Sequence, residues 1–294
     1  MNCREIQIRD PFILKDDKNK EYYLYGTTDK SAWSGKAVGF DAYVSKDLLY
    51  WEGPHPVFRP KPDFWADQNF WAPEVHLYHG RYYMIASFKS NDRHRGVQIL
   101  AADSPLGPFE TFIDGPVTPS NWDCLDGTLY LDESEQPWII FSHEWTQVED
   151  GQMCCMKLSK DLRSTETEPV TLFTASQASW SIPNTGDVVK RDGENYVTDG
   201  PFLYKTHSGA LLMLWSSYSC TGYAMGISRS VSGKITGPWV HDSKPIYQKD
   251  GGHGMLFQTF EGRLMLAIHS PNVTPNERLF LIPMEEIEDQ IKLV

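Results

Sequence analysis

The sequence repeats a two-strand pattern five times, and this repetition restricts the chain to a repeat architecture. Each copy opens with a short apolar stretch and continues, after a polar turn, with a second stretch rich in aromatic and aliphatic residues. The first stretches cover residues 10–14, 72–78, 126–131, 199–204 and 253–257; the second cover 21–28, 81–88, 136–143, 210–217 and 263–270. Long helical periodicity is hard to find, so we predict an all-β chain.

A third stretch follows most copies, at residues 39–45, 96–102, 151–158 and 222–228, and several copies then end in a Gly-Pro turn. Four short antiparallel strands per repeat are typical of a propeller blade. We therefore predict a five-bladed β-propeller that uses residues 1–294 as a single catalytic domain. The outer strand of the fifth copy is not apparent from the sequence, and neither is the way in which the ring closes.

The charge balance favours a neutral or cationic partner. The chain has 27 Lys and Arg against 39 Asp and Glu, a net charge of −12, so bulk electrostatics will not hold nucleic acid or an anionic membrane.

No apolar run approaches the length of a membrane-spanning helix, and no apolar leader opens the sequence. The five cysteines lack metal-type spacing and suggest free thiols. We expect a cytoplasmic protein, although a trimmed secreted chain would look the same; the oligomeric state is left open.

The polar residues that open the first stretches should converge on one mouth of the propeller, because the first strand of every blade lines the central channel. They are Asp10, Asp126, Asp199 and His253. An Asp beside Gly or Pro is usually a turn former, but its recurrence at one phase of three repeats favours function. Like charges so close are costly unless used or paired, and their pKa values should separate. We interpret Glu74, in the second repeat, as structural or as a residue that supports the site side chains from behind.

Aromatic and basic side chains near strand ends are the next candidates for the site. Trp71 and Trp145 could form sugar-stacking platforms or could pack in the core, whereas the mid-strand Trp215 should be core. Arg278 could face the channel or the solvent. The chain has no zinc-type histidine spacing, phosphate-binding loop or serine-nucleophile motif.

These residues resemble glycoside hydrolase family 43, whose members are five-bladed propellers acting on arabinan and xylan. Residues 9–13 resemble the first motif of the family, which implies that Asp10 is the general base. Residues 45–52 resemble its S-x-D-L-x-x-W segment, and residues 71–75 match its second-blade opening, where the Trp borders the sugar. The resemblance also implies that Asp126 orients the acid, and that His253 faces the channel, where it could ligate a structural calcium ion.

The sequence departs from the family at the fourth blade. The family usually has Glu-Gly-Pro there, with the Glu as general acid, whereas this chain has Asp199-Gly-Pro. The shorter Asp199 could still serve as the acid. Glu144, at the end of a third-blade strand, could replace it, or the activity could be weakened.

The resemblance implies an inverting glycosidase that needs no cofactor for catalysis. Two carboxyl groups would lie about 6.5–9.5 Å apart, with room for a water molecule. Asp10 would deprotonate that water, Asp199 would protonate the leaving oxygen, and Asp126 would keep the pKa of the acid raised. We expect an arabinose- or xylose-containing oligosaccharide as the substrate, and an exo-acting α-L-arabinofuranosidase or β-xylosidase as the enzyme. The alternatives are a non-catalytic sugar-binding propeller and a retaining five-bladed glycosidase.

Overall fold

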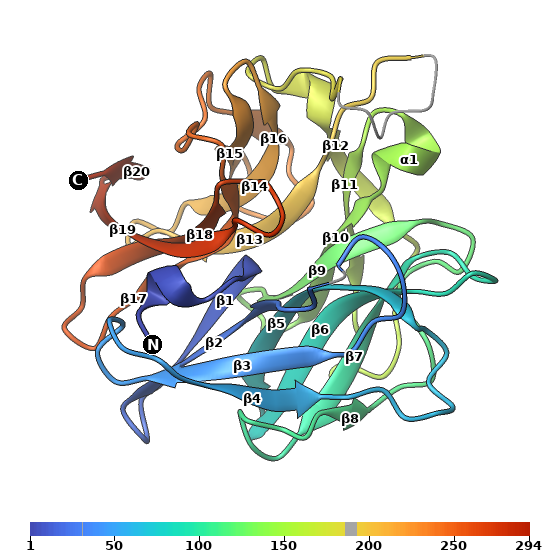
Figure 1. Ribbon diagram of the computed structural model, residues 1–294. Helices are drawn as coiled ribbons and strands as arrows, with labels where there is room; N and C mark the ends of the chain where they lie inside the picture. Colours follow the sequence, from blue (N-terminus) through green and yellow to red (C-terminus); the bar gives the residue numbers. More distant parts are fainter. Residues whose placement is uncertain (31, 186–192) are drawn as a thin grey trace.

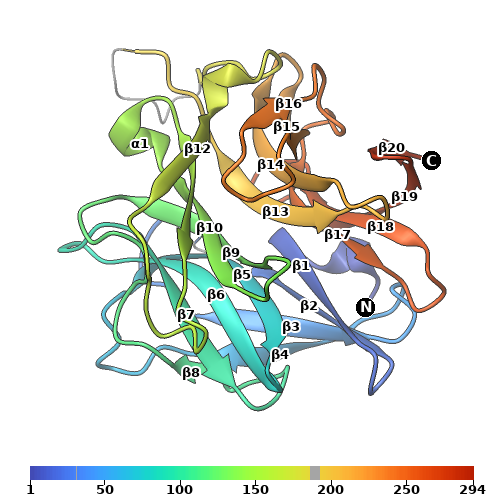
Figure 2. The same ribbon diagram turned by 180° about the vertical axis from the view of Figure 1, so that it is seen from behind.

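Five four-stranded antiparallel sheets make up the computed structural model, which describes residues 1–30, 32–185 and 193–294. The sheets are arranged as blades around an axis (Figure 1), and the view from behind shows the same ring (Figure 2). Each sheet is formed by strands consecutive in sequence, and the first strand of each blade contacts the first strands of its neighbours. The predicted five-bladed, all-β propeller is therefore confirmed.

The first three blades run from the N-terminus to residue 174. Blade 1 contains β1 (Arg9–Asp16), β2 (Glu21–Thr27), β3 (Phe40–Ser45) and β4 (Glu52–Phe58). Blade 2 contains β5 (Gln68–Tyr78), β6 (Arg81–Lys89), β7 (Gly96–Ala102) and β8 (Glu110–Thr111). Blade 3 contains β9 (Cys124–Leu131), β10 (Pro137–His143), β11 (Gln152–Lys157) and β12 (Val170–Thr174).

The last two blades run from residue 199 to residue 293, and blade 5 supplies the outer strand that the sequence left open. Blade 4 contains β13 (Asp199–Lys205), β14 (Leu211–Ser219), β15 (Gly222–Ser230) and β16 (Trp239–His241). Blade 5 contains β17 (Gly252–Gln258), β18 (Leu264–Ser270), β19 (Arg278–Ile287) and β20 (Gln290–Leu293). The helical segments are short: η1 (Cys3–Glu5), α1 (Trp145–Val148) and η2 (Ala175–Gln177).

Every innermost strand is interrupted near its start by a β-bulge. The register of the first strand on the second shifts there in each blade, and one residue at each shift has a positive φ. These residues are Asp10 (54°), Ala72 (47°), Asp126 (56°), Gly200 (54°) and His253 (41°). Bulges re-aim side chains, and this conformation is costly for residues other than glycine. Its repetition around the ring therefore marks the part of the fold that positions the site.

Hydrogen bonds between neighbouring blades hold four of these bulges. In each case the backbone N–H of the bulge residue donates to a side chain at the end of the second strand of the preceding blade. The pairs are Ala72 to Thr27 (2.8 Å), Asp126 to Ser87 (2.8 Å), His253 to Ser216 (2.9 Å) and Asp10 to His269 (3.1 Å). The last bond joins blade 1 to blade 5, so it helps to close the ring.

The N-terminal segment adds a second closure. Gln7 forms a β-bridge with Arg278, and the Ile8 N–H donates to the Glu277 carbonyl at 3.4 Å. The N-terminal segment thus helps to close the ring by pairing with the start of β19. Each blade still consists of its own four strands.

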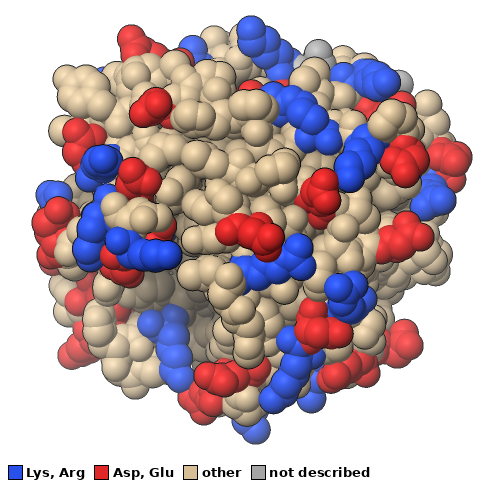
Figure 3. Space-filling view, turned by 90° about the horizontal axis from the view of Figure 1, so that it is seen from below, with Lys and Arg blue, Asp and Glu red and all other residues tan. Residues whose placement is uncertain are grey.

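Apolar side chains pack between adjacent blades and leave the polar bulges at the axis. Trp215 is fully buried, as predicted, and packs in the cluster between blades 3 and 4. All five cysteines are free thiols. Within the described residues, none of the helices has the length and apolar character needed to cross a bilayer. The face seen in Figure 3 carries acidic and basic side chains intermixed.

Candidate active site

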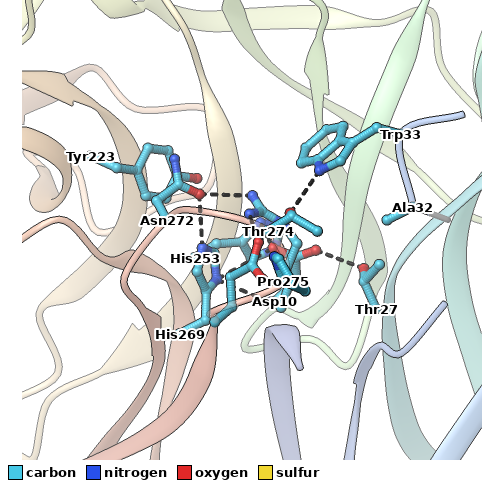
Figure 4. A network of polar contacts seen from close by, with 12 residues as sticks. Asp10, Thr27, Ala32, Trp33, Tyr223, His253, His269, Asn272, Thr274 and Pro275 are labelled. Atoms are coloured by element: carbon cyan, nitrogen blue, oxygen red, sulfur yellow. Dashed lines mark hydrogen bonds and ion pairs between the residues drawn. The ribbon is translucent and has the colours of Figure 1, made fainter. Parts of the chain in front are cut away.

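Three carboxylates and a histidine from four blades meet at the axis. His253 Nδ1 lies 3.2 Å from Asp10 Oδ1 and 3.5 Å from Asp126 Oδ2. Asp10, Asp126 and His253 are each 6–8% exposed, and Asp199 at the start of β13 is partly exposed. Figure 4 shows Asp10 between His253, His269 and Thr27. The structure therefore brings together the four polar residues that the repeats predicted.

The contact between His253 and Asp10 is an ion pair. Burial alone would lower the pKa of His253, but Asp10, Asp126 and Asp199 outweigh it and raise that pKa. Burial would raise the pKa of Asp10, yet His253 and the neighbouring Arg9 hold it below its usual value. Thr27 also donates its hydroxyl hydrogen to Asp10 Oδ2 at 2.7 Å. Asp10 is therefore a carboxylate at neutral pH.

Asp126 and Asp199 shift in the opposite direction. Burial is the main reason that the pKa of Asp126 is raised, and the charges of Asp199 and Asp10 add to it. The Gly200 N–H donates to Asp126 Oδ2 at 3.1 Å and opposes the shift. Burial also raises the pKa of Asp199. One cluster thus combines a carboxyl group whose pKa is lowered with two whose pKa values are raised.

Asp199 does not occupy the phase that the repeats predicted for it. In the strand register Asp199 pairs with Ser216, as Arg9 pairs with Thr27, so Asp199 is equivalent to Arg9. Gly200 is the residue equivalent to Asp10. The prediction of one common phase for the three aspartates was wrong by one residue, because the apolar pattern does not reveal which residue of Asp-Gly-Pro forms the bulge.

Glycine is favoured at position 200 for two reasons. Its φ of +54° is unfavourable for other residues, and a Cβ there would lie 2.5 Å from Cδ2 of the His253 ring. The imidazole therefore packs directly against the backbone of blade 4, and this close approach keeps His253 beside the carboxylates.

Arg9 is a site residue that the sequence reasoning did not single out, although it stands next to Asp10. Its Nη1 lies 2.7 Å from the buried Glu277 carboxylate, and its Nη2 donates to Asn272 Oδ1 at 2.8 Å. Trp33 was missed as well. Its indole ring is 54% exposed, lies 4.7 Å from the Arg9 guanidinium and donates its N–H to Thr274 at 2.8 Å (Figure 4).

Glu144 belongs to a separate buried group. Arg95 Nε donates to Glu144 Oε2 at 3.1 Å, and both side chains are less than 10% exposed. The Arg95 guanidinium lies 3.8 Å above the Trp71 ring, whose N–H donates to the Ala32 carbonyl at 2.6 Å. One face of Trp71 is thus covered by Arg95, so a sugar can meet only what remains of that indole. The role of Glu144 as an alternative acid stays a prediction.

Arg278 binds backbone carbonyls where the N-terminal segment meets blade 5. Its Nε donates to the Arg4 carbonyl at 3.0 Å, and its Nη1 donates to the carbonyls of Pro275 and Glu277. The guanidinium therefore fastens the N-terminal segment to blade 5, and a substrate-binding role for Arg278 stays a prediction. Trp145, the first residue of α1, is partly buried, and its stacking role stays a prediction.

The surroundings of His253 do not suit a metal ligand. Its Nδ1 faces two carboxylates, and the carboxylates favour the charged imidazolium, which cannot donate a lone pair from that nitrogen. Calcium also prefers oxygen ligands. Among the described residues, no group of three or more His, Cys, Asp or Glu side chains could hold a metal ion. The calcium ion expected in the axial channel stays a prediction.

The propeller fold, the axial cluster of carboxyl groups and a match to a family model together define the class of the protein. It is a glycoside hydrolase. The sequence model described as "Glycosyl hydrolases family 43" matches residues 5–290. The chain therefore belongs to glycoside hydrolase family 43, and the enzyme acts on oligosaccharides or polysaccharides.

Three relatives illustrate the similarity. The crystal structure of an endo-arabinase from Bacteroides thetaiotaomicron superposes with a TM-score of 0.90 at 40% identity, covering 98% of both chains. An extracellular endo-α-(1→5)-L-arabinanase of Bacillus subtilis is 24% identical, covering 83% of this chain and 71% of the relative. An exo-1,5-α-L-arabinanase from a bovine ruminal metagenomic library has a TM-score of 0.70 at 21% identity and shares the fold, covering 98% and 97%.

Proposed function

We propose that this glycosidase hydrolyses α-1,5-linked L-arabinan at bonds within the chain, with inversion at the anomeric carbon. The endo-arabinase with 40% identity and the Bacillus subtilis arabinanase support arabinan as the substrate and internal cleavage as the mode of action. The exo-acting arabinofuranosidase or xylosidase predicted from the sequence is not confirmed, and it becomes the alternative outcome of the test.

Asp10 acts as the general base in this proposal. Its carboxylate is held in the ionised form by His253 and Arg9 and is oriented by the Thr27 hydroxyl. It removes a proton from a water molecule as the water oxygen attacks the anomeric carbon. The His253 imidazolium fixes Asp10 Oδ1, so the base keeps its orientation while the proton moves.

Asp199 acts as the general acid. Burial favours its protonated form, so it can give a proton to the leaving glycosidic oxygen as the bond to the anomeric carbon breaks. Asp126 does not touch the reacting bond in this proposal. Its own pKa is raised by burial and by the charges of Asp199 and Asp10, and it accepts the Gly200 N–H, which holds the backbone beside the acid in place. The carboxylates around the channel also stabilise the positive charge that develops on the sugar.

One observation carries the proposal: carboxyl groups with oppositely shifted pKa values share one axial cluster. Asp10 lies against the His253 cation, whereas Asp199 is partly exposed and lies one residue before the bulge of β13. Carboxyl groups whose environments drive their pKa values apart take the roles of base and acid.

Digestion of linear α-1,5-arabinan by the purified enzyme tests the proposal. We expect the viscosity to fall quickly while few reducing ends appear, and arabino-oligosaccharides to be the first products. Proton NMR during the first turnovers should show the β-anomer at the new reducing end, because inversion converts the α-linkage. Release of arabinose alone, or activity confined to xylan, would contradict the proposal; the α-anomer would indicate the retaining mechanism.

A further inference from the structure

The Tyr223 hydroxyl is a buried group beside the proposed acid, and the mechanism above does not use it. Tyr223 lies in β15 of blade 4, is 2% exposed and donates its O–H to Asp199 Oδ2 at 2.9 Å. Burial, with Asp199 as the next cause, raises the pKa of Tyr223 well above its usual value. The hydroxyl therefore stays protonated and remains a donor throughout the working pH range.

Packing on several sides holds the Tyr223 ring in place. The Gly251 N–H donates to the Tyr223 carbonyl at 3.0 Å, and a Cβ on Gly252 would lie 3.1 Å from the ring carbon Cε1. The His269 ring lies nearly parallel, at an angle of 20° and a centroid distance of 5.8 Å. The donor therefore has a fixed position on the strand next to the acid's own hairpin.

The fixed Tyr223 hydroxyl is important because the residue that accepts its hydrogen bond is an aspartate. The family pattern has a glutamate at this position, and the aspartate has one rotatable bond fewer, so its carboxyl group stays closer to β13. Tyr223 occupies Oδ2 from one side, which leaves Oδ1 as the oxygen that can present a proton to the channel.

We propose that Tyr223 is the positioning residue of the general acid and makes Oδ1 of Asp199 the proton-donating oxygen. This inference rests on the proposed function, in which Asp199 is the acid. In the reaction the Oδ1–H bond breaks, the proton goes to the leaving oxygen, and the electron pair stays on Asp199. The Tyr223 hydrogen bond to Oδ2 then becomes charge-assisted and strengthens as the carboxylate forms. Asp10 passes the proton from the water to solvent, and Asp199 takes up a proton from solvent for the next cycle.

The substitution Tyr223→Phe tests the role with two substrates, a dinitrophenyl and a phenyl α-arabinotrioside. The dinitrophenolate leaves without a proton, whereas the phenolate needs one. We expect kcat on the phenyl substrate and on arabinan to fall roughly ten- to hundredfold, since a hydrogen bond to a charged group is lost. Turnover of the dinitrophenyl substrate and the KM values should stay within about twofold. The basic limb of the kcat/KM profile should move to higher pH, because the Asp199 carboxylate has lost a donor.

Tyr25→Phe is the matched control. It removes an equally buried hydroxyl of blade 1, which donates to the Pro105 carbonyl of blade 2 at 2.6 Å. It should lower the melting temperature without changing the leaving-group dependence or the pH profile. An equal loss on both substrates after Tyr223→Phe, or an unmoved basic limb, would overturn the role of Tyr223 alone. Absence of hydrolysis by the wild-type enzyme would overturn the proposed function and the inference together.

Discussion

Asp10 Oδ1 lies 3.2 Å from His253 Nδ1, and this ion pair joins the first blade of the ring to the last. Both residues sit at bulges with positive φ, so the backbone is strained at the two positions that hold the charges. Hydrogen bonds from the two backbone N–H groups, Asp10 to His269 and His253 to Ser216, keep these conformations in place. The ion pair between Asp10 and His253 therefore both helps to close the ring and orients the proposed base.

Replacing Asp10 by Asn tests the base directly. The amide keeps the shape of the side chain and can still accept from Thr27, but it cannot take a proton from water. We expect kcat on arabinan to fall by about 10²–10⁴-fold. A dinitrophenyl arabinotrioside should suffer the same loss, because every leaving group needs the activated water. Steady-state kinetics on both substrates measure this, and undiminished turnover would remove Asp10 from the mechanism.

Replacing Gly200 by Ala should damage both stability and activity. The new Cβ would meet the His253 ring at 2.5 Å, and the φ of +54° is costly with a Cβ. Overpacking costs about 1–3 kcal/mol and the left-handed backbone about 1–2 kcal/mol more. Urea unfolding measures the sum, and kcat should fall because His253 is pushed off Asp10.

The control for this substitution is Gly262→Ala. Gly262 has a similar φ of +79°, but a Cβ there would meet nothing within 4 Å. We expect a cost of about 1–2 kcal/mol from the backbone alone and no change in activity. Equal costs for the two variants would show that the contact with His253 is unimportant.

The repeat in the sequence was sufficient to predict the blades, because alternating apolar stretches between Gly, Pro and Asp turns encode strand position locally. Asp10, Asp126 and His253 were found for the same reason, since each opens a first strand. Asp199 was assigned to the wrong phase because bulge register depends on backbone conformation at Gly200, and the apolar pattern carries no information about it.

The site residues that could not be predicted from the sequence depend on contacts between blades. Arg278 was considered as a channel cation, and nothing in the sequence indicated that its guanidinium also binds the Arg4 carbonyl, over 270 residues away. Trp33 was hidden inside a polar insert of residues 27–38, and Tyr223 looked like an ordinary strand aromatic. Three inserts of moderate length, residues 27–38, 59–70 and 174–196, contain aromatic residues and led us to favour exo action; residues 31 and 186–192 of these inserts lie outside the described residues. The partners of these side chains depend on how the five blades are arranged in space, and a single sequence does not show that arrangement.

The Trp33 indole should contribute to substrate binding. It is 54% exposed, lies over Arg9, and contacts the Trp71 ring at 5.1 Å. Aromatic stacking contributes about 0.5–1.5 kcal/mol, so Trp33→Ala should raise KM for arabinan roughly two- to tenfold with little change in kcat. Trp33→Phe, which keeps a ring, should lie close to the wild type. A fall in kcat at constant KM would argue against a binding role.

His269 should make the protein sensitive to acid. Burial, followed by the charge of Arg9, lowers its pKa to about 3 from 6.5. The unfolded chain therefore binds a proton between pH 6.5 and 3 that the folded protein does not. The contribution to stability is complete above pH 6.5 and is lost as the pH falls, by up to about 5 kcal/mol. Neutral His269 also matches the structure, in which Nδ1 accepts from the Asp10 N–H.

Unfolding free energies measured from pH 7 to pH 4 test this. His269→Asn keeps an acceptor for Asp10 but cannot titrate, so we expect lower stability at pH 7 and a shallower decline toward pH 4. His79→Asn is the control, because His79 is exposed and its φ of +49° suits asparagine. It should decline as steeply as the wild type. Identical slopes for all three proteins would mean that His269 is protonated without penalty.

The identity of the general acid can be settled by comparing Asp199→Asn with Glu144→Gln. Asp199→Asn should reduce hydrolysis of arabinan and of a phenyl arabinotrioside by about 10²–10⁴-fold and leave the dinitrophenyl arabinotrioside nearly unaffected. Glu144→Gln should lower all three rates by a similar factor, or not at all. It should also destabilise the protein by about 3–5 kcal/mol, because the buried Arg95 loses its charged partner.

The carboxyl groups of Glu144 and Asp199 have different hydrogen-bond partners. This difference is why we expect the two substitutions to have different effects on rate and stability. Glu144 neutralises a guanidinium that is stacked on Trp71, so a proton on Glu144 would leave Arg95 unpaired in a buried site. Asp199 accepts its hydrogen bond from a neutral donor, Tyr223, rather than from a buried cation. Chemical denaturation of both variants, run beside the kinetics, separates loss of the acid from loss of the fold. If Glu144→Gln shows the leaving-group dependence and Asp199→Asn does not, Glu144 is the acid and the assignment of Asp199 is wrong.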